Sequence, residues 1–359
     1  MQPRRQRRQA GAAFIMPTHA RRVRGRLRRL CLCSLIVGGA GCAVGSGQRA
    51  DLNVAASTAV LATIPVGEGP TLLAMSPDGS RVYAAANAKL SVISTATNSV
   101  VATLGIEPYP AGLALTPDGT RALVTNLFAV RLTVIDTTKD ALGAPIALFN
   151  DRFRGGFGHI GLSPDGTTAY VANPANQVLA IVDTVKPDTD SLMMDMQPVD
   201  VAVGPDGRTV YVAGCKNFCV TGTIEVLDAR SRLVTTSITV GSKPYRIALS
   251  PDGRRAYTTN LGEPSVSVVD LATNTTTATV AVPVEPTGLA VARDGSRIFV
   301  ANQPAGTITV IDAVTNTLQA KVKVANNVRE VVVTPDGQRL YVSTLDSVLA
   351  VSVQSLVGG

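Results

Sequence analysis

The chain has 359 residues, of which 45% are hydrophobic and 16% are charged, so it contains enough apolar sequence to fill a large core. Its formal net charge of +7 comes entirely from residues 1–41, which contain ten arginines and no acidic residue. The remaining residues have 23 basic side chains (33 − 10) against 26 acidic ones, a net charge of −3. This balance excludes a charge-driven nucleic-acid-binding protein.

Residues 1–41 predict a bacterial secretory signal peptide of the lipoprotein type. The arginines precede a short apolar run at residues 30–37, which is too short to span a bilayer, and small residues follow it. Met16 is an alternative start, because the residues after it already form a complete leader. Export through this leader is therefore expected.

The end of the leader resembles a lipobox, in which a cysteine becomes the lipidated first residue of the mature protein. Cys42 is that cysteine, although Gly39 stands where leucine is usual. Lipidation of Cys42 would anchor the protein to the cell membrane, and residues 42–56 would be a flexible tether. Cleavage after Ala43 is the alternative, and it would leave a soluble secreted or periplasmic protein.

A short phrase, Pro-Asp-Gly with a small residue before it, recurs along the rest of the chain. Its glycines are 40 to 47 residues apart, and one copy has lost the proline; they are Gly79, Gly119, Gly166, Gly207, Gly253, Gly295 and Gly337. Proline, aspartate and glycine in this order favour a tight turn between two antiparallel strands. The aspartates are therefore interpreted as turn formers and not as catalytic groups.

Each turn is flanked by the pattern of two strands. The residues four and six before each glycine are aliphatic, and an aromatic stands four residues after the glycine in six of the seven copies. Two further strands follow in each unit, for example at residues 307–312 and 318–322. A period of about 42 residues with four strands per unit predicts a propeller.

The ends of the repeat predict how the ring closes. The last unit supplies only three strands, while an unassigned strand at residues 59–64 precedes the first turn. We expect this N-terminal strand to complete the last blade. The sequence thus predicts an all-β, seven-bladed propeller at residues 57–356, with four antiparallel strands in each blade.

The repeats resemble those of the YVTN-type β-propeller family of bacterial exported and surface proteins. The resemblance rests on runs such as YVANPANQVLAIVDT and FVANQPAGTITVIDAVTNTLQAKVKV, and it covers about 300 residues. It implies a propeller fold and carries almost no information about activity. The absence of tryptophan excludes Trp-Asp repeats and the tryptophan docking motifs of quinoprotein dehydrogenases.

Blade four carries a pair of cysteines, Cys215 and Cys219, in the loop between its second and third strands. In an oxidising compartment we expect them to form a disulfide. No further cysteine or histidine stands nearby to complete a metal site, and redox catalysis is a weaker alternative because the usual spacing is two residues. No cofactor is predicted, since haem, phosphate-loop and zinc motifs are missing.

One position at the start of the innermost strand differs between blades, whereas its neighbours are uniform. Seven residues before the glycines stand Leu72, Gly112, His159, Asp200, Arg246, Gly288 and Glu330. We expect the four ionisable residues to meet at the channel mouth, with the two glycines leaving open space. They would form either a paired ionic cluster or a ligand site in which arginine binds an anion and histidine moves a proton.

Two functions follow from these observations. The first is a binding module of the cell envelope whose partner is a protein, a glycan or a small ligand. The second is a lactonase-like hydrolase or lyase that uses His159, Asp200, Arg246 and Glu330. The lack of a catalytic motif favours the binding module.

Overall fold

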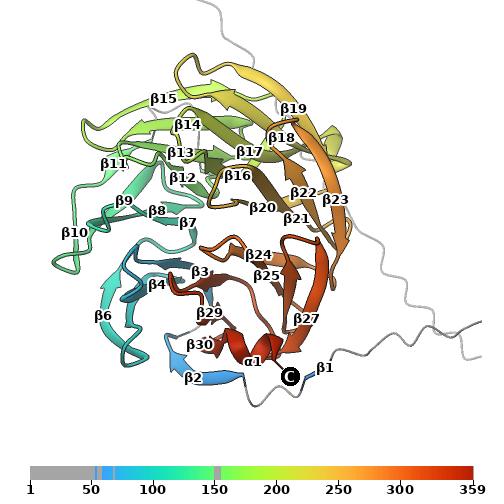
Figure 1. Cartoon of the computed structure of the whole chain (residues 1–359). Helices are drawn as coiled ribbons and strands as arrows, with labels where there is room; N and C mark the ends of the chain where they lie inside the picture. The colour runs from blue at the N-terminus through green and yellow to red at the C-terminus, as the bar shows by residue number, and fades with distance from the viewer. Residues whose placement is uncertain (1–52, 55–58, 68, 149–154, 359) are drawn as a thin grey trace, which may run out of the picture. The chain divides into compact units, whose positions relative to one another are not determined.

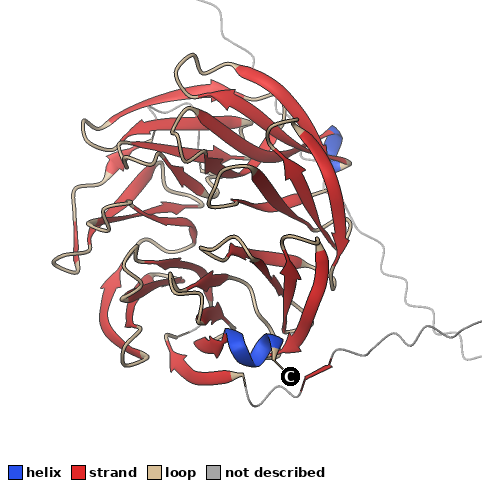
Figure 2. Cartoon of the chain, viewed as in Figure 1, coloured by secondary structure: helices blue, strands red, loops and turns tan. Residues whose placement is uncertain are grey.

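Seven β-sheets, one for each copy of the repeated turn, make up the described part of the chain (Figure 1). The computed structural model describes residues 53–54, 59–67, 69–148 and 155–358. In each sheet, consecutive strands are antiparallel neighbours, because each turn is too short to connect parallel strands. The seven-bladed propeller predicted from the sequence is thereby confirmed, and strands dominate the cartoon in Figure 2.

The first four blades follow in chain order from the inner strand to the outer one. Blade one contains β3 (Pro70–Met75), β4 (Arg81–Ala86), β5 (Lys89–Ser94) and β6 (Ser99–Gly105). Blade two contains β7 (Pro110–Leu115), β8 (Arg121–Asn126), β9 (Arg131–Asp136) and an outer strand in two pieces, β10 (Ala141–Leu142) and β11 (Ile146–Ala147). Blade three contains β12 (Ile160–Leu162), β13 (Thr168–Asn173), β14 (Val178–Asp183) and β15 (Asp188–Met193). Blade four contains β16 (Gln197–Val203), β17 (Thr209–Lys216), the 3-10 turn η1 (Asn217–Cys219), β18 (Thr221–Asp228) and β19 (Val234–Val240).

The remaining three blades complete the ring. Blade five contains β20 (Pro244–Leu249), β21 (Arg255–Asn260), β22 (Ser265–Asp270) and β23 (Thr275–Ala281). Blade six contains β24 (Pro286–Val291), β25 (Arg297–Asn302), β26 (Thr307–Asp312) and β27 (Thr317–Lys323). Blade seven contains β28 (Val331–Val333), β29 (Arg339–Ser343), β30 (Ser347–Ser352) and β2 (Val60–Pro65), and the short helix α1 (Val353–Val357) follows β30.

Closure depends on β2, which pairs antiparallel with β30 and supplies the outer strand of blade seven. The inner strand of every blade packs against that of the next, and β28 of the last blade packs against β3 of the first. The predicted N-terminal closing strand is therefore confirmed. A second N-terminal strand, β1 (Asn53–Val54), runs parallel to β27 at the edge of blade six.

The repeated turns are held by their aspartates, as predicted. In blade one, Asp78 Oδ1 accepts hydrogen bonds from Ser76 Oγ (2.6 Å) and from the backbone N–H of Ser80 (3.0 Å). These bonds lower the pKa of Asp78 to about 2, with the Ser76 bond contributing most. Gly79 has a φ of +73°, in the left-handed region that side chains other than glycine rarely adopt.

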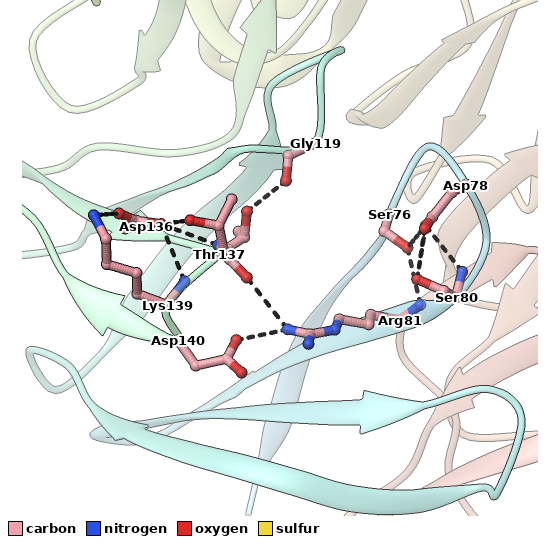
Figure 3. A network of polar contacts seen from close by, with 10 residues as sticks. Ser76, Asp78, Ser80, Arg81, Gly119, Asp136, Thr137, Lys139 and Asp140 are labelled. Atoms are coloured by element: carbon pink, nitrogen blue, oxygen red, sulfur yellow. Dashed lines mark hydrogen bonds and ion pairs between the residues drawn. The ribbon is translucent and has the colours of Figure 1, made fainter.

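Arginines two residues after the turn glycine join neighbouring blades, a role that the sequence pattern did not reveal. Arg81 Nη1 of blade one donates to the carbonyl of Thr137 (3.2 Å) and to Asp140 Oδ1 (2.7 Å), both in blade two. Figure 3 shows this contact, with Thr137 in turn donating to the carbonyl of Gly119. We call the bond from such an arginine to a carbonyl of the next blade the arginine clamp.

The arginine clamp recurs around the ring. Arg121 of blade two donates to the carbonyl of Thr184 in blade three (2.6 Å), and Arg255 of blade five donates to that of Ala313 in blade six. Arg339 of blade seven donates to the carbonyl of Thr95 in blade one (2.7 Å), across the point of closure. The clamp thus adds a polar bond to the apolar contact between blades, and one copy locks the ring.

The predicted leader (residues 1–41), Cys42 and most of the predicted tether (42–56) lie outside the described residues. The exception in the tether is Asn53–Val54, which forms β1. Among the residues that the structure does describe, no helix has the length and apolar character needed to cross a membrane.

The closing clamp can be tested by substitution. Arg339→Ala should lower the free energy of unfolding by about 1.5 kcal/mol, because it removes a charged hydrogen bond across the closure. Arg297→Ala is the matched control, since the Arg297 side chain hydrogen-bonds to Gln319 of its own blade (3.2 Å) and to no other described residue, and this substitution should cost less than about 0.5 kcal/mol. Urea denaturation of both variants measures the difference, and equal losses would contradict a closing role.

Candidate functional site

The seven inner strands begin on one face of the ring, which we call the channel mouth. In five blades the first or second residue of the inner strand is a proline, after which the pairing shifts by one residue, as between Pro198 and Asp200 and between Pro244 and Arg246. Proline has no N–H to donate, so it tolerates the interrupted ladder, and the resulting β-bulge re-aims the following side chain. The bulge therefore positions the variable residue that the sequence singled out.

Three of the four predicted site residues form one ionic cluster. Arg246 on β20 forms an ion pair with Glu330, which directly precedes β28, and its Nη1 lies 3.8 Å from Oδ2 of Asp200 on β16. Asp200 also accepts backbone N–H bonds from Val201 and Ile247, each of 2.9 Å. Blades four, five and seven are thus connected through a single guanidinium, which we call the Arg246 cluster.

Burial controls the electrostatics of the Arg246 cluster. Asp200 and Glu330 are 4% and 5% exposed, and this burial raises the pKa of both carboxyl groups against the opposing effect of Arg246. Burial alone would lower the pKa of Arg246, but the two carboxyl groups outweigh it and raise that pKa above its ordinary value. The guanidinium is therefore permanently charged and is neutralised by its own neighbours.

His159 lies near the cluster but is not hydrogen-bonded to it. The residue precedes β12, is 7% exposed, and its Nδ1 has no hydrogen-bond partner among the described residues. Its ring packs edge-on against Tyr245, with 5.7 Å between the ring centroids. Burial and then the charge of Arg246 lower the pKa of His159 well below 6.5, so the imidazole is neutral at pH 7.

Tyr245 is a residue of this site that the sequence interpretation missed. It occupies the bulge position of blade five, and it contacts a histidine two blades away. The sequence feature that could have revealed Tyr245 is the proline before it. Proline stands at this place in five repeats, and it indicates a β-bulge that changes the direction of the next side chain.

The expectation that Gly112 and Gly288 leave open space is wrong. A Cβ on Gly112 would lie 2.5 Å from the carbonyl oxygen of Gly158, and one on Gly288 would lie 2.8 Å from both the carbonyl oxygen of Arg329 and the Cα of Glu330. These glycines allow the inner strand of the next blade to approach closely.

The predicted cysteine pair forms the expected disulfide between Cys215 and Cys219, beside η1 in blade four. Lys216, within the same loop, lies 3.0 Å from Oε1 of the buried Glu225 and 3.4 Å from Asp195. The loop is thus held by one covalent bond and by ion pairs to its own and the preceding blade.

Comparisons with known proteins extend only to the fold. No family model matches the chain, and no curated protein matches its sequence. Among solved structures, the chain is similar to hydrazine synthase from Kuenenia stuttgartiensis, with a TM-score of 0.72 and 19% identity over 80% of this chain and 96% of that one. It is also similar to the β-propeller domain of Cps50 (Swd1) from Myceliophteria thermophila, with a TM-score of 0.71 and 12% identity over 82% of this chain and 99% of that domain. At these identities the likeness shows a shared propeller fold.

The lowered pKa of His159 predicts a loss of stability in mild acid. Below pH 6.5 the unfolded chain takes up a proton on this residue, whereas the folded protein resists it until a lower pH is reached, so the free energy of unfolding falls as the pH falls. His159 is the only histidine after residue 41. In urea denaturation, lowering the pH from 7.5 to 5.5 should therefore cost His159→Gln less unfolding free energy than it costs the unsubstituted protein, and an equal pH dependence would contradict a buried neutral imidazole.

The Arg246 cluster predicts a large penalty when one partner is removed. Glu330→Ala leaves a buried guanidinium with only the more distant Asp200, and it should cost about 3–5 kcal/mol of unfolding free energy. Glu285→Ala is the control, because Glu285 is exposed on a loop of the same face and should change stability by less than about 0.5 kcal/mol. If Glu330→Ala cost no more than Glu285→Ala, the assigned ion pair would be wrong.

Proposed function

We propose that the chain is an exported, lipid-anchored binding module whose channel mouth contacts a protein, a glycan or a small ligand of the cell envelope. The observation that carries this proposal is the closure of the Arg246 cluster by its own ion pairs. A site prepared to bind an anionic substrate keeps its guanidinium available, whereas here Glu330 already occupies it.

The arrangement of His159 argues in the same direction. A general base requires a hydrogen-bonded partner that orients it and a pKa near the working pH. Nδ1 of His159 has no partner among the described residues, and its pKa lies well below that range. The lactonase-like alternative would need a proton-transfer pair between His159 and Asp200 or Glu330, and the described contacts contain none.

The sequence supports the proposed location. The arginine-rich leader, the apolar run and Cys42 have the order of a lipoprotein signal, and the repeats resemble the YVTN-type propellers of bacterial exported and surface proteins. A propeller exposes loops from all of its blades on one rigid face, which suits recognition of a partner.

Anchoring and binding are tested together on the full-length chain in a bacterial host. Mass spectrometry should find a diacylglyceryl-modified Cys42 as the first residue, and Cys42→Ser should move the protein from the membrane fraction to the soluble fraction.

The purified anchored protein should retain a specific component from envelope extract. An unprocessed leader would overturn the anchoring, and an extract from which nothing specific is retained would overturn the binding role.

A further inference from the structure

The channel mouth has a cleft between blades one and two, and the described residues that line it carry no charged side chain. The cleft has a volume of about 520 Å³ and is lined by Gly69, Thr71, Asn87, Tyr109, Pro110, Ala111 and Leu127. This volume lies in the range of small-molecule sites, which combine apolar walls with a few polar groups. None of these lining residues belongs to the Arg246 cluster. We call it the Tyr109 cleft.

Tyr109 lines the cleft and forms an exposed aromatic pair with Phe128, the residue after Leu127 in the chain. Tyr109 and Phe128 are 59% and 68% exposed, and their rings meet edge-on with 5.3 Å between centroids. Leu127, which directly precedes Phe128 in the chain, is also exposed. Large apolar side chains gathered on a surface in this way mark a binding site more often than isolated ones do.

The backbone of Tyr109 holds its ring in this position. Its φ is +62°, and the same place in the repeat is also left-handed in blades one and three, where it is Gly69 and Gly156. The Tyr109 N–H donates to the carbonyl of Asn87 (3.1 Å), and its carbonyl accepts from the N–H of Leu127 (3.0 Å). A bulky residue is thus held in a conformation that the repeat otherwise gives to glycine or to a charged residue.

Three polar side chains of the cleft form no hydrogen bond within the described part of the chain. These are the hydroxyls of Thr71 and Tyr109 and the carboxamide of Asn87. The N–H of Gly69, by contrast, donates to the carbonyl of Leu345 (2.8 Å). The side-chain groups that remain for a ligand are therefore two hydroxyls and an amide.

We propose that the Tyr109 cleft binds a neutral sugar, stacked through its C–H face on the Tyr109 ring. A sugar ring has one apolar face and a rim of hydroxyls, which matches an aromatic wall with hydroxyl and amide groups beside it. The described lining has no acidic or basic side chain, so it complements an uncharged ligand. This inference rests on the proposed binding role and names its ligand class.

The test uses the purified full-length chain and four neutral probes: maltotetraose, cellotetraose, mannotetraose and the N-acetylglucosamine tetramer. Saturation-transfer NMR and calorimetry should detect at least one of them. Tyr109→Gly should weaken that binding at least tenfold, and Asn87→Ala and Thr71→Val should each weaken it severalfold. Tyr109→Gly copies the residue that blades one and three use at this position, so its thermal unfolding midpoint should not fall.

Val314→Ala is the matched control, because Val314 is 75% exposed in a turn of blade six beside the Pro-Asp-Gly turns, and its removal should leave sugar binding unchanged. Binding to none of the four probes, or binding that survives Tyr109→Gly, would overturn the inference. If envelope extract still yielded a specific protein partner in that case, the proposed binding role would stand and only the sugar site would fall. Loss of both would remove the binding role as well.

Discussion

Closure of the ring by β2 is the constraint on which the other features depend. A blade is a sheet with two apolar faces, and only its two neighbours can bury them. The pairing of β2 with β30 and the Arg339 clamp to Thr95 make blade seven equivalent to the others, so that blade one is covered as well. Without this step blades one and seven would each expose a face, and the inner strands would not be held around a common axis.

The closed ring brings the inner strands so near to one another that side chains at their starts must fit between backbones. Glycine is required where the next strand approaches most closely, at Gly112 and Gly288. Where a charged residue occupies this position, it is taken out of water and must be neutralised locally. The Arg246 cluster is the result: two carboxyl groups neutralise its one guanidinium, so it connects blades four, five and seven and leaves no free positive charge for a ligand.

The turns, the four-stranded blades and the closure of the ring could be predicted from the sequence, because each blade repeats a local pattern. The turn at Asp78 and Gly79 needs only four residues to be understood, and the missing strand of the last repeat indicated closure by residues 59–64. The sequence could not predict contacts between residues that lie far apart along the chain, such as those of Arg339 with Thr95 and of His159 with Tyr245. The variable position contains the three residues of the Arg246 cluster, but whether Gly112 lined an open space or a close contact depended on the distance between strands. A linear pattern does not contain that distance.

The repeat also explains why the blades contribute different side chains to the channel mouth. At the same structural position, blades four, five and seven carry ionisable residues that satisfy one another, while Leu72 and Gly112 of blades one and two carry no charge. Charges that are paired inside the protein gain nothing from a ligand, and breaking them would cost several kcal/mol. Free hydroxyls beside an exposed ring incur no such cost, since they only exchange water for a ligand. The capacity to bind is therefore expected where the ring has not used its polar groups to hold itself together.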